Sequence, residues 1–138
     1  MKYIISKEFS FEAAHRLIRN YTGKCTNNHG HSWRVRLYLE SANLDNKDMV
    51  VDFQETKILK QWIDENLDHT TILWEQDPMC KYIQDSGQRI FITRKNPTSE
   101  HMAEIIMEKA LQLFNTERVN VHCIELNETC TNGVKLYP

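Results

Sequence analysis

A run of alternating side chains between residues 29 and 40 limits the folds open to this chain more than any other feature. Its apolar phase holds Trp33, Val35, Leu37 and Leu39, and the positions between them carry polar or charged groups. A period of two predicts a long β-strand with one buried face. Residues 3 to 15 follow the same period, and the Asn- and Gly-containing stretch between the two runs predicts an antiparallel return.

Three histidines continue the apolar phases of these two strands. His29 and His31 stand two residues apart at the start of the second run, and His15 ends the first. Side chains two apart on a strand point to one face, so the antiparallel return brings the three imidazoles together. Three histidines without a fourth protein ligand are typical of a catalytic zinc site with an open position. Hydrogen-bonded core histidines are the alternative.

Cys25, four residues before His29, leaves a second metal arrangement open. As a fourth ligand it would close the site and make the metal structural. The remaining cysteines, Cys80, Cys123 and Cys130, show no Cys-x-x-Cys spacing. A chain of this size needs no disulfide framework, so we expect reduced thiols.

Length and composition describe a single domain spanning residues 1–138. The chain is 41% hydrophobic and 26% charged, and its formal net charge is -2. That balance argues against general binding to nucleic acid or to an anionic membrane. The start of the chain lacks the apolar core of a signal peptide, and no window is apolar enough to span a bilayer. We therefore expect a cytoplasmic protein.

Two helices are predicted from their start signals and apolar stripes. Asp52 and Glu55 form a capping-box pattern that begins a helix at Phe53, with a stripe at Ile58, Leu59, Trp62, Ile63 and Leu67. After Asn96-Pro97, Thr98 or Ser99 caps the second helix, with a stripe at Met102, Ile105, Ile106, Ala110 and Leu113.

The later strands are less regular. Residues 89 to 93 form a short strand candidate within a poorly readable stretch from 74 to 97. The strand predicted at 118 to 127 changes apolar phase between Cys123 and Ile124, which indicates burial on both faces or a bulge. Residues 134 to 137 form a terminal strand after a turn at Asn132-Gly133.

Asp68 and His69 follow the first predicted helix directly. A carboxylate beside an imidazole can hold and tune a general acid–base group. The same pair also occurs where a helix simply ends in a solvated loop.

Five short motifs run in order along nearly the whole chain: Phe11-Glu12-Ala13-Ala14-His15-Arg16-Leu17, Cys25 followed after three residues by His29-Gly30-His31, Leu67-Asp68-His69, Asn96-Pro97-Thr98-Ser99-Glu100, and Glu128-Thr129. Together they resemble the 6-pyruvoyl-tetrahydropterin synthase family. The three-residue gap before His29 and the Glu-Thr-Cys-Thr string at 128 to 131 are most similar to its bacterial carboxy-forming branch. That branch serves queuosine and other deazaguanine pathways.

The resemblance implies an α+β tunnelling fold, with an antiparallel sheet and two helices packed on one face. It implies trimers around a barrel, stacked as a homo-hexamer with active sites at the subunit interfaces. It also implies zinc bound by His15, His29 and His31, a catalytic thiol at Cys25 and an acid–base pair at Asp68 and His69. The implied substrate contacts come from Glu128, which anchors the pterin, and from Thr129, Thr98 and Ser99.

The implied reaction is a lyase cleavage of 7,8-dihydroneopterin triphosphate to 6-carboxy-5,6,7,8-tetrahydropterin, with release of acetaldehyde and triphosphate. Two alternatives remain open: the pyruvoyl-forming reaction, which retains the side-chain carbons, and a non-catalytic zinc or pterin-binding module with Cys25 on the metal. Candidates for the triphosphate are Arg16, Arg19 and Lys24, unless they form a solvated basic loop. Many members have Leu-Asn shortly after the Asp-His pair, whereas this chain has Thr70-Thr71-Ile72-Leu73. The resemblance therefore does not assign the residues of the pocket wall.

Overall fold

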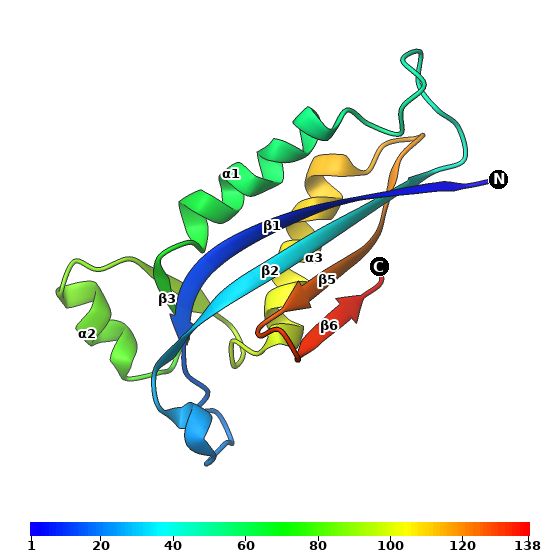
Figure 1. The fold of residues 1–138 in the computed structure, drawn as a ribbon. Helices are drawn as coiled ribbons and strands as arrows, with labels where there is room; N and C mark the ends of the chain where they lie inside the picture. The colour runs from blue at the N-terminus through cyan, green and yellow to red at the C-terminus, as the bar shows by residue number, and fades with distance from the viewer.

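The computed structural model describes residues 1–138 and contains six strands and three α-helices in one sheet-and-helix unit (Figure 1). In chain order the elements are β1 (Tyr3–His15), the 3₁₀ turn η1 (Lys24–Thr26), β2 (His29–Ser41), the 3₁₀ turn η2 (Phe53–Thr56), α1 (Lys57–Asn66), β3 (Thr70–Trp74), α2 (Met79–Asp85), β4 (Ile90–Thr93), α3 (Ser99–Phe114), β5 (Asn120–Asn127) and β6 (Gly133–Leu136).

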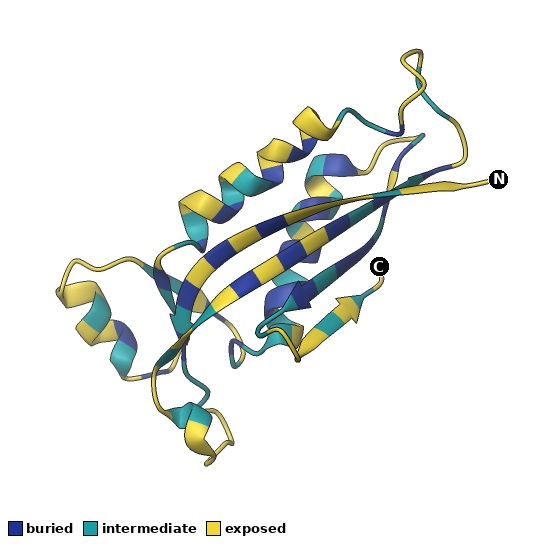
Figure 2. Ribbon diagram, viewed as in Figure 1, coloured by how far each residue is buried: buried dark blue, intermediate teal, exposed yellow.

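The predicted pair of long strands is confirmed as β1 and β2. They pair antiparallel without interruption from Tyr3 opposite Ser41 to His15 opposite His29. In Figure 1 they form the long curved centre of the sheet, whose strand order is β4-β3-β1-β2-β5-β6. Their buried and exposed residues alternate, as Figure 2 shows, and the buried phase faces the helices.

The expected α+β class is confirmed, but the sheet is mixed rather than antiparallel throughout. β3 pairs parallel with β1, and β4 pairs parallel with β3. A parallel pair needs a crossover connection, and α2, a third helix outside the expected two, lies in the crossover between β3 and β4. Neither β3 nor α2 was predicted. In β3 the adjacent residues Ile72 and Leu73 are both fully buried, so this strand shows no alternation of buried and exposed side chains.

The core lies between the sheet and the two helices α1 and α3. Trp33 is fully buried at its centre, stacked on Phe11 at 5.7 Å between ring centroids. Its indole N–H donates to the carbonyl of Ala13 at 3.2 Å, so the buried ring leaves no polar atom unpaired. The same face of β1 and β2 continues into the three histidines, which places them at the end of the core.

The helix predictions hold in their main features. The capping box of Asp52 and Glu55 is present, although the first turn after Phe53 is 3₁₀ and α1 proper starts at Lys57. Ile58 is wrong as a core residue, since it is 48% exposed. It lies about 100° around the helix from Leu59, which with Ile63 and Leu67 faces the core. Thr98 is the cap of α3.

The irregular strand near the C-terminus contains the predicted bulge. Tyr38 faces Cys123 while Leu39 faces Val121, so His122 is the extra residue of β5. This shift puts Val121 and Ile124, three residues apart, on the same core face, while Cys123 is buried on the other face of the strand. None of the helices is of a length and apolarity that could cross a membrane.

Candidate functional site

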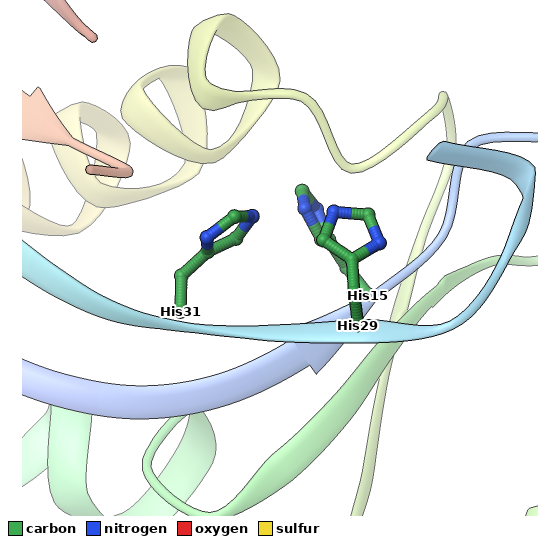
Figure 3. Close-up of side chains that lie close together, drawn as sticks. All are labelled: His15, His29 and His31. Carbon is green, nitrogen blue, oxygen red and sulfur yellow. The ribbon is translucent and has the colours of Figure 1, made fainter. Parts of the chain in front are cut away.

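Three imidazoles converge where β1 ends and β2 begins (Figure 3). His15 lies directly opposite His29 in the strand pair, and His31 lies opposite Ala13 on the same face. One potential ligand atom from each ring lies within 4.8 Å of the others. The predicted convergence is therefore confirmed, and the three rings could hold a metal ion.

Backbone carbonyls orient two of these rings. The Nδ1 atom of His15 lies 2.7 Å from the carbonyl oxygen of Pro97, and Nδ1 of His29 lies 2.7 Å from that of Asn27. A carbonyl oxygen only accepts, so we assign the ring proton to Nδ1 in both histidines. In its neutral form each ring then has a free electron pair on Nε2, as metal-binding histidines do.

The inward nitrogen atoms lack other partners. Nε2 of His15 and Nε2 of His31 are buried and make no hydrogen bond. Burial lowers the pKa of His31 and outweighs the Glu128 carboxylate, which raises it. A buried polar atom without a partner is costly. Neutral imidazoles with unpaired, inward Nε2 atoms fit the coordination of a metal such as zinc.

Glu128 reaches this cluster from the end of β5. Its Oε1 lies 3.1 Å from Nε2 of His15 and 3.5 Å from Nε2 of His31, contacts that are ion pairs only when the imidazole is protonated. The His15 imidazole lowers the pKa of Glu128 and outweighs burial, which raises it, so the group stays a carboxylate. Glu128 therefore borders the open side of the histidine cluster.

Thr129 is largely occupied within its own loop. Its hydroxyl oxygen accepts hydrogen bonds from the backbone N–H groups of Asn132 and Thr131, at 3.1 and 3.3 Å. These contacts close the turn between β5 and β6 and so hold Glu128 in place.

Asp68 and His69 form a held turn between α1 and β3. Asp68 Oδ1 accepts from the backbone N–H of Glu12 at 2.8 Å, and Oδ2 lies 3.0 Å from His69 Nδ1. Burial raises the pKa of Asp68, but the Glu12 amide and His69 outweigh it and leave the pKa lowered. The predicted contact between carboxylate and imidazole is therefore present.

This pair does not join the three histidines within one chain. His69 borders a hollow of about 370 Å³ that Ala13, His31 and Thr70 also line, together with Glu12, Ala14, Gly30 and Ser32. The last four of these residues have the strand phase opposite to that of His15, His29 and His31. Most of the strand residues that line the hollow therefore lie on the sheet face opposite to the three histidine side chains, and the acid–base pair is not part of the compact histidine group.

Cys25 lies in the 3₁₀ turn η1 and is half-buried. Its carbonyl accepts from the N–H of Leu17 at 2.9 Å, and contact with its thiol raises the pKa of Tyr21. All four cysteines are free. The compact group of potential metal ligands contains the three imidazoles and no thiol, which argues against Cys25 as a fourth ligand.

Asn96 and Pro97 have roles that the sequence did not reveal, whereas Thr98 has the capping role that was predicted. The Asn96 side chain accepts from the N–H of Arg19 at 3.0 Å and donates to its carbonyl at 2.7 Å. Pro97 supplies the carbonyl that orients His15, and the Thr98 hydroxyl oxygen accepts from the N–H of His101 at 3.2 Å as the helix cap. Ser99 begins α3. The contacts of Asn96 and Pro97 join residues far apart in the chain and have no periodic signature.

The guanidinium of Arg16, a candidate for the triphosphate, is paired with a carboxylate of its own chain. Its Nε and Nη2 donate to the two carboxylate oxygens of Asp77 at 2.8 and 2.5 Å, and the Asp77 side chain is fully buried. Arg19 instead lies over the ring of Trp74, 5.7 Å from its centroid. Lys24, in the turn η1, makes no ion pair.

Comparisons with known proteins extend over the whole chain. A sequence model of the family described as 6-pyruvoyl tetrahydropterin synthase matches residues 4–138. A Synechocystis protein named 6-carboxy-5,6,7,8-tetrahydropterin synthase is 36% identical over 140 residues, which cover 98% of this chain and 93% of the relative. A protein of the same name from Rickettsia bellii is 34% identical over 128 residues, covering 90% and 92%.

Solved structures share the fold. An uncharacterized protein from Wolinella succinogenes superimposes with a TM-score of 0.86 at 26% identity, covering 99% of this chain and 98% of its own. The 6-pyruvoyltetrahydropterin synthase of Plasmodium vivax superimposes with a TM-score of 0.78 at 17% identity, covering 100% and 98%, which supports the fold alone.

Proposed function

Because this chain belongs to the 6-pyruvoyl tetrahydropterin synthase family and is one of its lyases, we propose that it forms 6-carboxy-5,6,7,8-tetrahydropterin from 7,8-dihydroneopterin triphosphate. The by-products are acetaldehyde and triphosphate, and the product enters queuosine and 7-deazaguanine biosynthesis. The observation that carries the proposal is the cluster of three imidazoles, of which His15 and His31 have buried and unpaired Nε2 atoms, in a chain 32–36% identical to relatives of that name.

In this proposal His15, His29 and His31 bind zinc. When bound, zinc supplies Lewis-acid polarisation of a substrate oxygen, which makes the neighbouring C–H and O–H protons easier to remove. The carbonyls of Pro97 and Asn27 keep His15 and His29 in the tautomer that a metal needs.

The chain's own residues hold the substrate and move the protons. Cys25, as thiolate, acts as the base, and His69, oriented by Asp68, returns the proton. Glu128 accepts the paired N–H donors of the pterin, because a carboxylate can take two parallel hydrogen bonds. Thr129, Thr98 and Ser99 add substrate contacts. We place this thiol chemistry in the cytoplasm, where thiols stay reduced.

The position of the acid–base pair argues for an assembled enzyme. Asp68 and His69 lie outside the compact histidine group and border a hollow lined mostly from the opposite strand face, so a complete site needs this pair from a neighbouring copy. We propose a homo-hexamer, a dimer of trimers, with its active sites at the subunit interfaces.

A product assay tests the reaction. Zinc-loaded protein should consume the substrate and release acetaldehyde, and mass spectrometry should find the carboxy product. A product that retains every side-chain carbon would assign the pyruvoyl-forming reaction instead. Substrate consumption without acetaldehyde would exclude the carboxy-forming lyase, and zinc bound without turnover would leave only a binding module.

Two variants distinguish zinc binding by the histidines from proton removal by Cys25. Cys25→Ala should keep its zinc and lose turnover by at least about a hundredfold. His31→Ala should lose both zinc and turnover. Cys80→Ala, which removes a buried thiol outside the site, serves as the control and should remain active. Zinc loss in Cys25→Ala would contradict the role of Cys25 as base.

A further inference from the structure

We propose that Arg89 is a positioning residue that holds the turn carrying Asp68 and His69. Arg89 lies between α2 and β4, in the stretch from 74 to 97 where the sequence shows few secondary-structure signals. The inference deepens the proposed function, since it rests on Asp68 and His69 acting as the acid–base pair.

The Arg89 side chain binds the end of α1. Its Nη2 lies 3.0 Å from the carbonyl oxygen of Asp64, 3.2 Å from that of Glu65 and 3.1 Å from that of Asp68. The last carbonyls of a helix have no partner within the helix and carry its negative end. The last turn of α1 contains no basic residue, so Arg89 supplies this cation from another element.

The Asp68–His69 turn depends on such outside contacts. His69 is not glycine, yet its backbone has a φ of 58°, in the left-handed region that such residues rarely adopt. Its side chain is 74% exposed, so packing does not locate the imidazole. The ring position is therefore set by the backbone of the turn and by the Asp68 carboxylate.

Strand β1 and the Arg89 side chain hold this turn from its other sides. Glu12 of β1 donates its N–H to Asp68 Oδ1 at 2.8 Å and accepts from the N–H of His69 at 2.6 Å. Arg89 binds the carbonyl of Asp68, while its own carbonyl accepts from Thr71 N–H at 3.1 Å. Arg89 therefore connects the helix end, the turn and β3, and its loss frees the Asp68 peptide to rotate.

The test uses the full-length, zinc-loaded protein with Arg89→Ala and Arg89→Lys. In Arg89→Ala we expect the kcat to fall by about tenfold, with KM and zinc content within about twofold of the wild type, because the acid–base group is misplaced. Arg89→Lys should recover most of the activity, since an ammonium has three N–H donors for three carbonyls. Lys81→Ala on α2, an exposed cation paired only with Asp85, is the matched control.

A second measurement does not depend on turnover. Nitrogen-15 NMR of histidine-labelled protein at mildly alkaline pH reports which ring nitrogen of His69 carries the proton, with His69→Gln providing the assignment. We expect Nδ1–H in the wild type and in Lys81→Ala, and a mixture of tautomers in Arg89→Ala. An unchanged tautomer, even with a lower melting temperature, would overturn the proposal and leave Arg89 as a helix cap alone. If the wild type showed no lyase activity, the proposed function would fail while the tautomer would still test Arg89.

Discussion

Removal of Asp77 should weaken the whole end of the sheet that carries the candidate metal site. The Asp77 side chain is fully buried, and both of its oxygens accept from the Arg16 guanidinium. One of them also accepts from the N–H of Met79 at 2.8 Å, at the start of α2. Arg16 directly follows His15, so this pair joins the end of β1 to the segment before α2.

The expected loss of stability can be worked out from these contacts. Asp77→Ala leaves the Arg16 side chain, 21% exposed, without its carboxylate, which costs about 3 kcal/mol, at the low end for a broken buried pair. The lost contact at the start of α2 adds about 1 kcal/mol. A loss of about 4 kcal/mol corresponds to a melting temperature lower by roughly 10–15 °C. Asp77→Asn keeps an oxygen for Met79 and should lose less.

The pH dependence identifies the charge as the cause. Burial raises the pKa of Asp77, but the Arg16 guanidinium outweighs it and leaves the pKa lowered. A lowered pKa in the folded state stabilises the protein above the unfolded value of about 3.9, and this stability is lost as the pH falls through the folded value. The difference between the wild type and Asp77→Asn should therefore be constant from neutral pH to about pH 4 and shrink below it.

Thermal melts of both variants across pH, followed by circular dichroism, check this reasoning. Asp85→Ala is the control, because its carboxylate is 65% exposed and pairs only with Lys81, for about 0.5 kcal/mol or less. The reasoning is refuted if Asp77→Ala melts within about 2 °C of the wild type, or if its deficit persists unchanged in acid.

Two further predictions concern the histidine cluster directly. Zinc at a hundredfold excess over its Kd should raise the melting temperature by roughly 5–10 °C, because it satisfies the buried Nε2 atoms of His15 and His31, and His31→Ala should abolish this shift in a calorimetric scan. Glu128→Gln should raise KM by about tenfold, since an amide matches two N–H donors less well than a carboxylate, and should leave the zinc content measured by atomic emission unchanged. Zinc loss in Glu128→Gln would instead make Glu128 a metal ligand.

Much of the framework was predictable because it rests on local periodic signals. The alternation in residues 29 to 40 determined one long strand, and the phase of His15 relative to Phe9 and Phe11 put its ring on the core face. Capping signals at Asp52 and Thr98 marked the helix starts, because these side chains bind N–H groups only two or three residues away. The bulge near Cys123 was visible as a change of phase.

Other features were decided by contacts that no local pattern announces. The parallel joining of β3 to β1 depends on the α2 crossover, and the apolar run of β3 has no strand-specific period. The Pro97 carbonyl that orients His15 lies 82 residues away in the chain, and Asp77 lies 61 residues from Arg16. A motif shows that such residues occur but not which atoms they bind.

By itself, then, the sequence determined two strands that align three histidines on one face, because a side-chain period of two is a local property of the backbone. Only the tertiary structure decided the surroundings of those rings: the carbonyls that set their tautomers, the Glu128 carboxylate beside them, and the Asp68–His69 turn outside their compact group. Each of these depends on contacts between segments that are distant in the chain, and such contacts leave no local pattern in the sequence.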